Sequence, residues 1–213
     1  MDEKQVIASR VALELNPGNL VNLGIGIPSM VSEYVDKDKF ITFQAENGIV
    51  GLGPFETEDT LTVNASGLKA SIVEGGAFID SLTSFSLIRG GHIDVTVLGA
   101  LEVDEDGSIA SWIIPGKKVP GMGGAMDLVM GSKKVIIAMT HTNRGKAKIV
   151  EKCTLPLTAF KQANLIVTEM CVIEVHDDGL HLIEVHPDFT IEDVKNATEA
   201  HLIVDKVLPM KGI

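Results

Sequence analysis

The stretch Leu20-Val21-Asn22-Leu23-Gly24-Ile25-Gly26-Ile27-Pro28 joins a short apolar strand to a helix through a glycine turn. Proline suits the first turn of a helix, because its missing N–H would have no helical partner there. The same alternation continues along the chain, with strands predicted at residues 40–44, 93–98, 134–139 and 164–168, a hairpin at 172–185, and helices at 2–15 and 191–200. Strands that alternate with helices indicate an α/β protein with a largely parallel sheet.

The composition indicates one domain built around an aliphatic core. The chain has 213 residues, of which 45% are hydrophobic and only 4% aromatic, and no linker, repeat or low-complexity tract divides it. We therefore predict a single domain over residues 1–213. The formal net charge of -11 argues against nucleic acid as a partner, because phosphate binding needs a basic face. A small anionic ligand needs only a local patch and stays open.

The sequence predicts a cytoplasmic protein that does not enter a membrane. The charged start Met1-Asp2-Glu3-Lys4 is not followed by the apolar segment of a signal peptide. No apolar run approaches the ~20 residues that span a bilayer. Cys153 and Cys171 each lie in an apolar stretch without a CxxC or metal-ligand spacing, which is typical of small buried side chains in a reduced compartment.

Glu46 is the most informative single residue. It ends the run Phe40-Ile41-Thr42-Phe43-Gln44-Ala45-Glu46-Asn47-Gly48, and two more glycines follow at Gly51 and Gly53. A carboxylate at the tip of a buried strand, in a glycine-rich surround, is where an enzyme would keep a carboxylate nucleophile or base. The polar segment 51–64, with Thr57-Glu58-Asp59-Thr60, is expected to be irregular and exposed.

Two glycine loops are candidate sites for a negative charge. The loop Gly24-Ile25-Gly26-Ile27-Pro28 could present backbone N–H groups to an anion, or it could simply be a tight turn between strand and helix. Neither the third glycine of a dinucleotide motif nor the lysine of a P-loop is present. The loop Gly121-Met122-Gly123-Gly124-Ala125-Met126-Asp127, before a long apolar strand, could bring N–H groups against a developing oxyanion, or it could be a flexible connection.

The sequence does not predict a metal site. Asp104-Glu105-Asp106-Gly107 lacks the spacing of a calcium loop and is predicted to be a hairpin turn. His176 and His181 flank the predicted hairpin turn and could approach each other, but no Cys or carboxylate completes a ligand set with His186. No serine lies in a nucleophile elbow. The polar Arg89-Gly90-Gly91-His92 is expected to order a loop.

Five spaced motifs together resemble those of a known family. They are Asn22-Leu23-Gly24-Ile25-Gly26-Ile27-Pro28, Glu46-Asn47-Gly48-Ile49-Val50-Gly51-Leu52-Gly53-Pro54, Ile88-Arg89-Gly90-Gly91-His92-Ile93-Asp94, Ile114-Pro115-Gly116-Lys117 and Gly121-Met122-Gly123-Gly124-Ala125-Met126-Asp127. In this order they closely resemble the β subunit of the family I coenzyme A transferases. The resemblance continues through Lys152-Cys153-Thr154-Leu155-Pro156-Leu157-Thr158 and covers nearly the whole chain.

The resemblance implies a three-layer α/β/α sandwich and a covalent mechanism. It implies that Glu46 is the nucleophile and that the backbone N–H groups of Gly124 and Ala125 are the oxyanion donors. Asn47 and Gly48 are expected beside the substrate, and the expected contacts with coenzyme A (CoA) are Gly24, Gly26 and Lys69. CoA is then a substrate, with no permanently bound cofactor. A separate α subunit is implied as partner, commonly in an α2β2 assembly.

This sequence departs from the family pattern at two places. Ala45 stands where the family usually has Ser before the glutamate, which removes a hydrogen-bonding group beside Glu46. The stretch Asn64-Ala65-Ser66-Gly67-Leu68-Lys69 matches only loosely the family segment that carries a CoA-contacting lysine.

The reaction implied is ping-pong transfer of CoA between a short-chain acyl-CoA and a carboxylic acid, through a glutamyl-CoA thioester on Glu46. The acids left open are acetoacetate, butyrate, acetate and succinate. Three alternatives also stay open: a sugar-phosphate isomerase with a carboxylate base, a non-catalytic acyl-CoA-binding subunit, and a thioesterase that uses Glu46.

Overall fold

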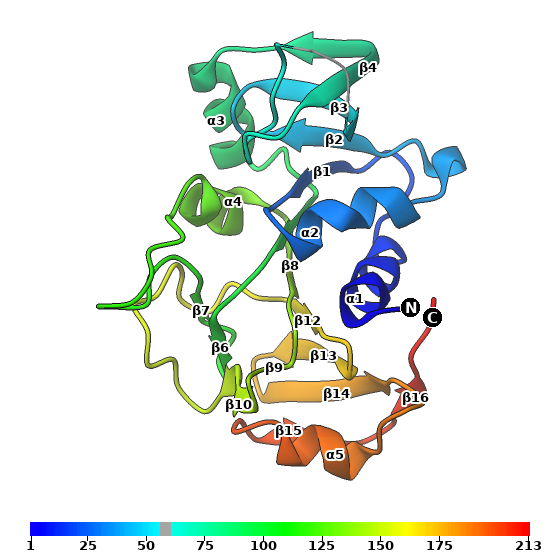
Figure 1. Cartoon of the computed structure of the whole chain (residues 1–213), viewed down its shortest axis with the longest axis vertical. Coiled ribbons are helices and arrows are strands. Elements are labelled where there is room, and N and C mark those ends of the chain that lie inside the picture. The colour runs from blue at the N-terminus through cyan, green and yellow to red at the C-terminus, as the bar shows by residue number, and fades with distance from the viewer. Residues whose placement is uncertain (56–60) are drawn as a thin grey trace.

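The computed structural model describes residues 1–55 and 61–213, and Figure 1 shows its course. The predicted surface segment Thr57-Glu58-Asp59-Thr60 lies outside the described residues. One 11-stranded sheet runs through the molecule, and helices lie on both of its faces.

The centre of the sheet is parallel, as predicted. Its strands run side by side in the order β2 (Thr42–Ala45), β1 (Leu20–Leu23), β5 (Val95–Leu98), β8 (Lys134–Ala138) and β12 (Leu165–Val167). Since parallel strands point the same way, the segments that follow them emerge at one edge of the sheet. The predicted strand at 40–44 begins later, because Phe40 has a left-handed backbone (φ 50°) and is exposed.

Antiparallel strands flank this centre on both sides. Next to β2 lie β3 (Ile49–Phe55) and β4 (Ala70–Phe78), so the prediction of an irregular segment is wrong over residues 51–55. Next to β12 lie β13 (Cys171–His176) and β14 (Gly179–Val185), which confirm the predicted hairpin. The short β15 (Leu202–Ile203) and β16 (Leu208–Pro209) pair in parallel with β14.

The helices complete a three-layer α/β/α sandwich, again as predicted. One face carries α1 (Glu3–Ala12), α2 (Ile27–Met30) and the 3-10 helix η1 (Val31–Tyr34); the other carries α3 (Ser81–Arg89) and α4 (Ala125–Gly131). Side chains alternate across β8: Ile136 packs in the α1 core, whereas Val135 and Ile137 pack in the α3–α4 core. The remaining helices are η2 (Lys37–Lys39) and α5 (Ile191–Asn196), the latter shorter than the predicted 191–200.

The first helix starts where the sequence predicts. The Asp2 side chain accepts a hydrogen bond from the Gln5 N–H (2.9 Å), and the Gln5 side-chain oxygen accepts one from the Asp2 N–H (2.9 Å). This capping box pairs two N–H groups that have no partner within the helix. The helix ends at Ala12 rather than at residue 15.

Two small sheets lie beside the main one. The larger joins β6 (Glu102–Asp104), β7 (Ile109–Ala110) and β11 (Ile149–Val150), and the smaller pairs β9 (Thr142–Asn143) with β10 (Lys146–Ala147). Asp104 accepts a hydrogen bond from the Ser108 N–H (2.8 Å), which confirms the predicted hairpin turn. Across residues 1–55 and 61–213, no helix has both the length and the apolar character to cross a membrane.

Candidate active site

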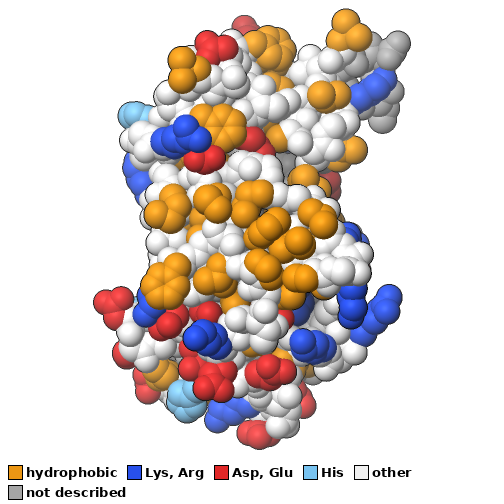
Figure 2. All heavy atoms as spheres, turned by 90° about the vertical axis from the view of Figure 1, so that its left-hand side faces the viewer, with side chains coloured by type: hydrophobic (Ala, Val, Ile, Leu, Met, Phe, Trp, Pro, Cys, Tyr) orange, Lys and Arg blue, Asp and Glu red, His pale blue; other side chains and the backbone are white. Residues whose placement is uncertain are grey.

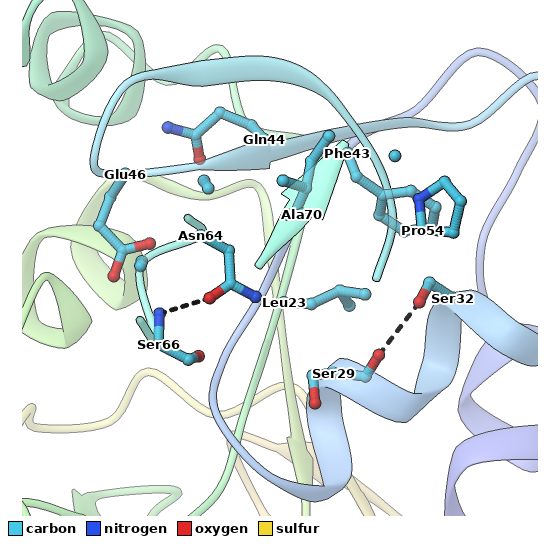
Figure 3. Close-up of a pocket in the computed structure, with 14 residues that line it drawn as sticks. Leu23, Ser29, Ser32, Phe43, Gln44, Glu46, Pro54, Asn64, Ser66 and Ala70 are labelled. Carbon is cyan, nitrogen blue, oxygen red and sulfur yellow. Dashed lines mark hydrogen bonds between the residues drawn. The ribbon is translucent and has the colours of Figure 1, made fainter. Parts of the chain in front are cut away.

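Glu46 follows β2 directly and is half-buried at the carboxyl edge of the sheet (Figure 3). The turn after it depends on Gly48, which has a φ of 115° and lies against the Ile79 carbonyl oxygen, where a side chain would collide. The Ile79 N–H also donates to the Gly48 carbonyl (2.9 Å). The glycine therefore lets β2 reverse into β3 with Glu46 at the tip.

A chain of neutral groups holds Glu46. Asn22 on β1 donates from Nδ2 to Glu46 Oε2 (3.2 Å) and to Gln44 Oε1 (2.8 Å). Gln44 Nε2 donates to Ser84 Oγ (2.9 Å), and this hydroxyl donates to the Glu46 backbone carbonyl (2.9 Å). In the described part of the chain no Lys or Arg forms a salt bridge with Glu46. The carboxylate is thus oriented without being neutralised.

The predicted glycine loop lies against Glu46. A Cβ added to Gly124 would be 3.2 Å from Glu46 Cγ, so a larger residue there would push against the Glu46 side chain. Among the described residues, the Gly124 N–H donates to no protein acceptor, whereas the Ala125 N–H donates to the Met122 carbonyl (3.1 Å). Of the two predicted donors, only Gly124 has a free N–H in this structure. The expectation that the loop leads directly into a strand is wrong, because α4 begins at Ala125 and lies between the loop and β8.

Asn47 and Gly48 shape the turn and line neither of the hollows beside Glu46. The Asn47 side chain is exposed and donates to the Val63 carbonyl (2.8 Å), which ties the turn to the segment after residue 60.

The three predicted CoA contacts do not all lie beside Glu46. Gly24 lies at the end of β1 near Glu46, but its N–H donates to the Val97 carbonyl (2.8 Å) and is not available to an anion. Gly26 takes a φ of 86° at the start of α2, and Lys69 is exposed at an isolated bridge with Val63. Neither residue lines a hollow beside Glu46.

Two hollows meet at Glu46. The enclosed hollow, shown in Figure 3, lies between α2–η1 and strands β2 to β4; its wall includes Leu23, Phe43, Leu52, Pro54, Asn64 and Ala70. The open hollow lies on the other side, and its wall includes Gly24, Leu98, Ser111, Pro120, Met122 and Gly124. Glu46 lines both, so a molecule that spans the two hollows passes its carboxylate.

Sequence reasoning missed four residues that build this site: Asn22, Gln44, Ser84 and Asn64. The available signal was a buried polar residue within an apolar strand, as in Leu20-Val21-Asn22-Leu23 and Phe43-Gln44-Ala45. Such a residue must find hydrogen-bond partners inside the fold. Asn64 accepts from the N–H groups of Ser66 (2.9 Å) and Leu68 (3.1 Å), which leaves its amide NH2 directed into the enclosed hollow (Figure 3).

The other predicted features behave as structural elements. Arg89 donates to Asp127 (2.8 Å) and joins α3 to α4, as expected of a residue that orders a loop. His176 and His181 do approach each other, with ring centroids 4.6 Å apart, and each ring also pairs with a carboxylate. The described residues contain no group of three or more side chains that could hold a metal ion.

Comparison with known proteins identifies the family. A family model described as "Coenzyme A transferase" matches residues 4–197. This chain belongs to the coenzyme A transferase family. It is 51% identical to the acetate CoA-transferase subunit beta of Escherichia coli K12, over 96% of this chain and 95% of that subunit. It corresponds over its length to the β subunit of this transferase.

Longer relatives carry the same region as part of one polypeptide. The transferase chain is 44% identical to the mitochondrial succinyl-CoA:3-ketoacid coenzyme A transferase 2B of Mus musculus, over 97% of this chain but only 41% of that protein. It also superposes on the acyl-CoA transferase apoenzyme of Escherichia coli O157:H7 with a TM-score of 0.78 and 24% identity, covering 97% of this chain and 43% of that one. This likeness shows the shared fold.

The coenzyme A transferase chain exposes an apolar face beside the open hollow. Figure 2 shows a broad band of hydrophobic side chains across this side of the molecule, over α4 and the segments 112–122 and 155–160. We define the apolar face by its large exposed members, with exposures between 41% and 66%: Val119, Met126, Met130, Leu157 and Phe160. A contiguous exposed patch of this kind is typical of a protein contact surface.

Proposed function

We propose that Glu46 carries CoA covalently in a ping-pong transfer. The Glu46 carboxylate attacks the thioester carbonyl of an acyl-CoA, expels the CoA thiolate and forms a mixed anhydride. The thiolate then attacks the Glu46 carbonyl of this anhydride, which releases the carboxylate of the first acid and leaves a glutamyl-CoA thioester. A second carboxylate reverses both steps and departs as its own CoA ester.

The observation that carries this proposal is how Glu46 is held. A cation beside the carboxylate would lower its nucleophilicity, and Glu46 receives a neutral amide hydrogen bond from Asn22 instead. Its position between two hollows suits a group that must meet an acyl carbon on one side and a thiolate on the other. Closure of the site against water would protect the anhydride from hydrolysis.

Gly124 is the proposed oxyanion donor. Gly124 lies beside the Glu46 side chain, and among the described residues its N–H has no acceptor, so it is available to the negative charge that would develop on the tetrahedral intermediate. One such donor typically stabilises the transition state by ~3 kcal/mol. Ala125 would serve as a second donor only after its N–H leaves the Met122 carbonyl. The family resemblance is the support for placing Asn47 and Gly48 beside the substrate and Gly24, Gly26 and Lys69 in contact with CoA.

The proposed partner is a coenzyme A transferase α subunit, in an α2β2 complex. This is supported by relatives in which the matching region fills 41–43% of one longer chain, whose remainder leaves room for a part equivalent to an α subunit. The apolar face borders the open hollow through Pro120 and Met122 and suits that contact. We also propose one domain, supported by the continuous sheet, and a cytoplasmic location, supported by two free cysteines.

The test is CoA transfer by the complex with its α subunit, comparing wild type with Glu46→Gln. An amide cannot form the anhydride, so the variant should assemble normally and lose transfer entirely. Glu74→Gln, an exposed carboxylate on β4, is the matched control and should keep full activity. Substantial transfer by Glu46→Gln would refute the assignment, and CoA release without an acceptor acid would indicate a thioesterase instead.

A further inference from the structure

The two hollows beside Glu46 differ in size and in access. The enclosed hollow has a volume of about 50 Å³, and the open hollow about 430 Å³. An acyl-CoA attacked by Glu46 extends from the carbonyl carbon in two directions, with a short acyl chain on one side and the long CoA arm on the other. The open hollow gives that arm the wider way out of the protein.

We propose that the enclosed hollow holds the acyl chain and selects short, uncharged acids. This rests on the proposed function of Glu46 and names the class of acid that it serves. Leu23, Phe43, Leu52, Pro54 and Ala70 supply the apolar part of the wall. The hydroxyls of Ser29 and Ser32 in the wall donate to backbone carbonyls, and the amide NH2 of Asn64 is directed inward. Phe43 and Ala45 project from the same face of β2, so the chain would begin beside Ala45 and run toward Phe43.

The volume sets the length of chain that fits. A hollow of about 50 Å³ has room for a short chain of a few non-hydrogen atoms. Acetyl, butyryl and acetoacetyl chains meet that limit, whereas an octanoyl chain exceeds it.

The charge of the wall selects against dicarboxylic acids. Among the described residues that line the enclosed hollow there is no Lys, Arg or His, and Glu46 is the ionisable group present. A succinyl chain would place its second carboxylate in this hollow without a cation, close to the charge of Glu46. Burial of an unpaired charge is strongly unfavourable.

Ala45 fits the same account. It is buried and lines the enclosed hollow directly before Glu46. A serine in its place would add a hydroxyl to the wall, so alanine keeps the start of the acyl path apolar.

The first test is an acceptor panel on the wild-type complex with acetate, butyrate, acetoacetate, succinate and octanoate. We expect kcat/KM for succinate and for octanoate to be at least about 100-fold below that for butyrate. Succinate or octanoate within about tenfold of butyrate would overturn the proposal. Absence of transfer to every acid would contradict the function of Glu46 instead.

The second test enlarges the hollow. Leu52→Ala removes three carbons from its wall, so the ratio of kcat/KM for hexanoate to that for butyrate should rise about tenfold or more. Val50→Ala, on the same strand but outside the wall, is the control and should leave the ratio unchanged. An unchanged ratio in Leu52→Ala, or an equal rise in Val50→Ala, would contradict the assignment.

Discussion

The two ends of the sheet hold their carboxylates in opposite ways. At the β2 end, Glu46 is half-buried, and among the described residues its carboxylate receives one hydrogen bond, from the neutral amide of Asn22. At the β14 end, Glu184 is buried and accepts two hydrogen bonds from the Arg10 guanidinium (2.6 and 3.0 Å). Charge pairing joins α1 to the sheet at the β14 end, whereas among the described residues no salt bridge forms with the carboxylate that we propose to react.

The charged network at the β14 end extends over several elements. Arg10 also contacts Glu14 (2.8 Å), and Glu14 contacts Lys134 on β8 (2.6 Å). Burial raises the pKa of Glu14, but hydrogen bonds from Lys134 and Arg10 more than offset it and leave the pKa lowered. These pairs join α1 to the sheet, so changes here should affect stability and not the CoA-transfer step.

The largest expected effect at this end comes from Arg10→Met. The substitution leaves Glu184 buried without its partner, which should lower the free energy of unfolding by about 3–5 kcal/mol. Lys133→Met breaks the exposed pair with Asp94 and should cost less than about 1 kcal/mol. Denaturant titration measures both. Equal losses of unfolding free energy in the two variants would mean that burial of the Arg10–Glu184 pair is unimportant. Combining Arg10→Met with Glu184→Leu removes the unpaired carboxylate and should recover stability.

His141 makes the stability of this half depend on pH. It is fully buried between the hydroxyls of Thr168 (3.0 Å) and Thr198 (2.9 Å), and burial, assisted by Lys148, lowers its pKa from 6.5 to about 4. The unfolded chain therefore binds the proton first as the pH falls. Stability from His141 is complete above pH 6.5 and is lost progressively toward pH 4, by about 3 kcal/mol in all.

Unfolding titrations between pH 7 and pH 4 check this effect. His141→Gln should flatten the pH dependence of the unfolding free energy, and the exposed His201→Gln should leave it as in wild type. An unchanged slope in His141→Gln would show that other groups govern the acid sensitivity.

Apart from the control variants, the smallest expected effect is at the β2 end, in Asn22→Ala. Loss of the amide that orients Glu46 should lower kcat about 10–100-fold, or about 1.4–2.7 kcal/mol, with little change in KM. Thr96 pairs with Asn22 on the next strand, and its hydroxyl is buried without a partner among the described residues. Thr96→Val should therefore keep full activity. A similar loss in both variants would point to packing and not to orientation.

The central strands were predictable because they are buried on both faces. Their continuous Val, Ile and Leu runs distinguish them from half-buried strands, as in Val135-Ile136-Ile137-Ala138. Strand β3 was missed because Gly51, Gly53 and Pro54 disfavour a strand locally. Pairing explains these glycines: Gly51 lies against Gly76 and Gly53 against Ser71 of β4, where side chains would not fit.

Residues of the candidate site were predictable where they lie within a local sequence motif. Glu46 and Gly124 were both predicted as candidate site residues, and the structure places them on the wall of the same hollow. Asn22 was missed as a site residue because its contact with Glu46 depends on the parallel register that pairs Asn22 with Gln44. Single-sequence patterns do not specify such a register between separate strands. The two hollows likewise exist only after β2, β3 and the glycine loop come together.

The central claim is that Glu46 becomes covalently bound to CoA, and mass spectrometry of the β subunit tests it most directly. The complex is incubated with butyryl-CoA, with and without borohydride, and then digested. We predict a CoA thioester on the peptide that contains Glu46, reduced by borohydride to the corresponding alcohol and absent from Glu46→Gln. Turnover without an adduct, or an adduct on another residue, would contradict the account.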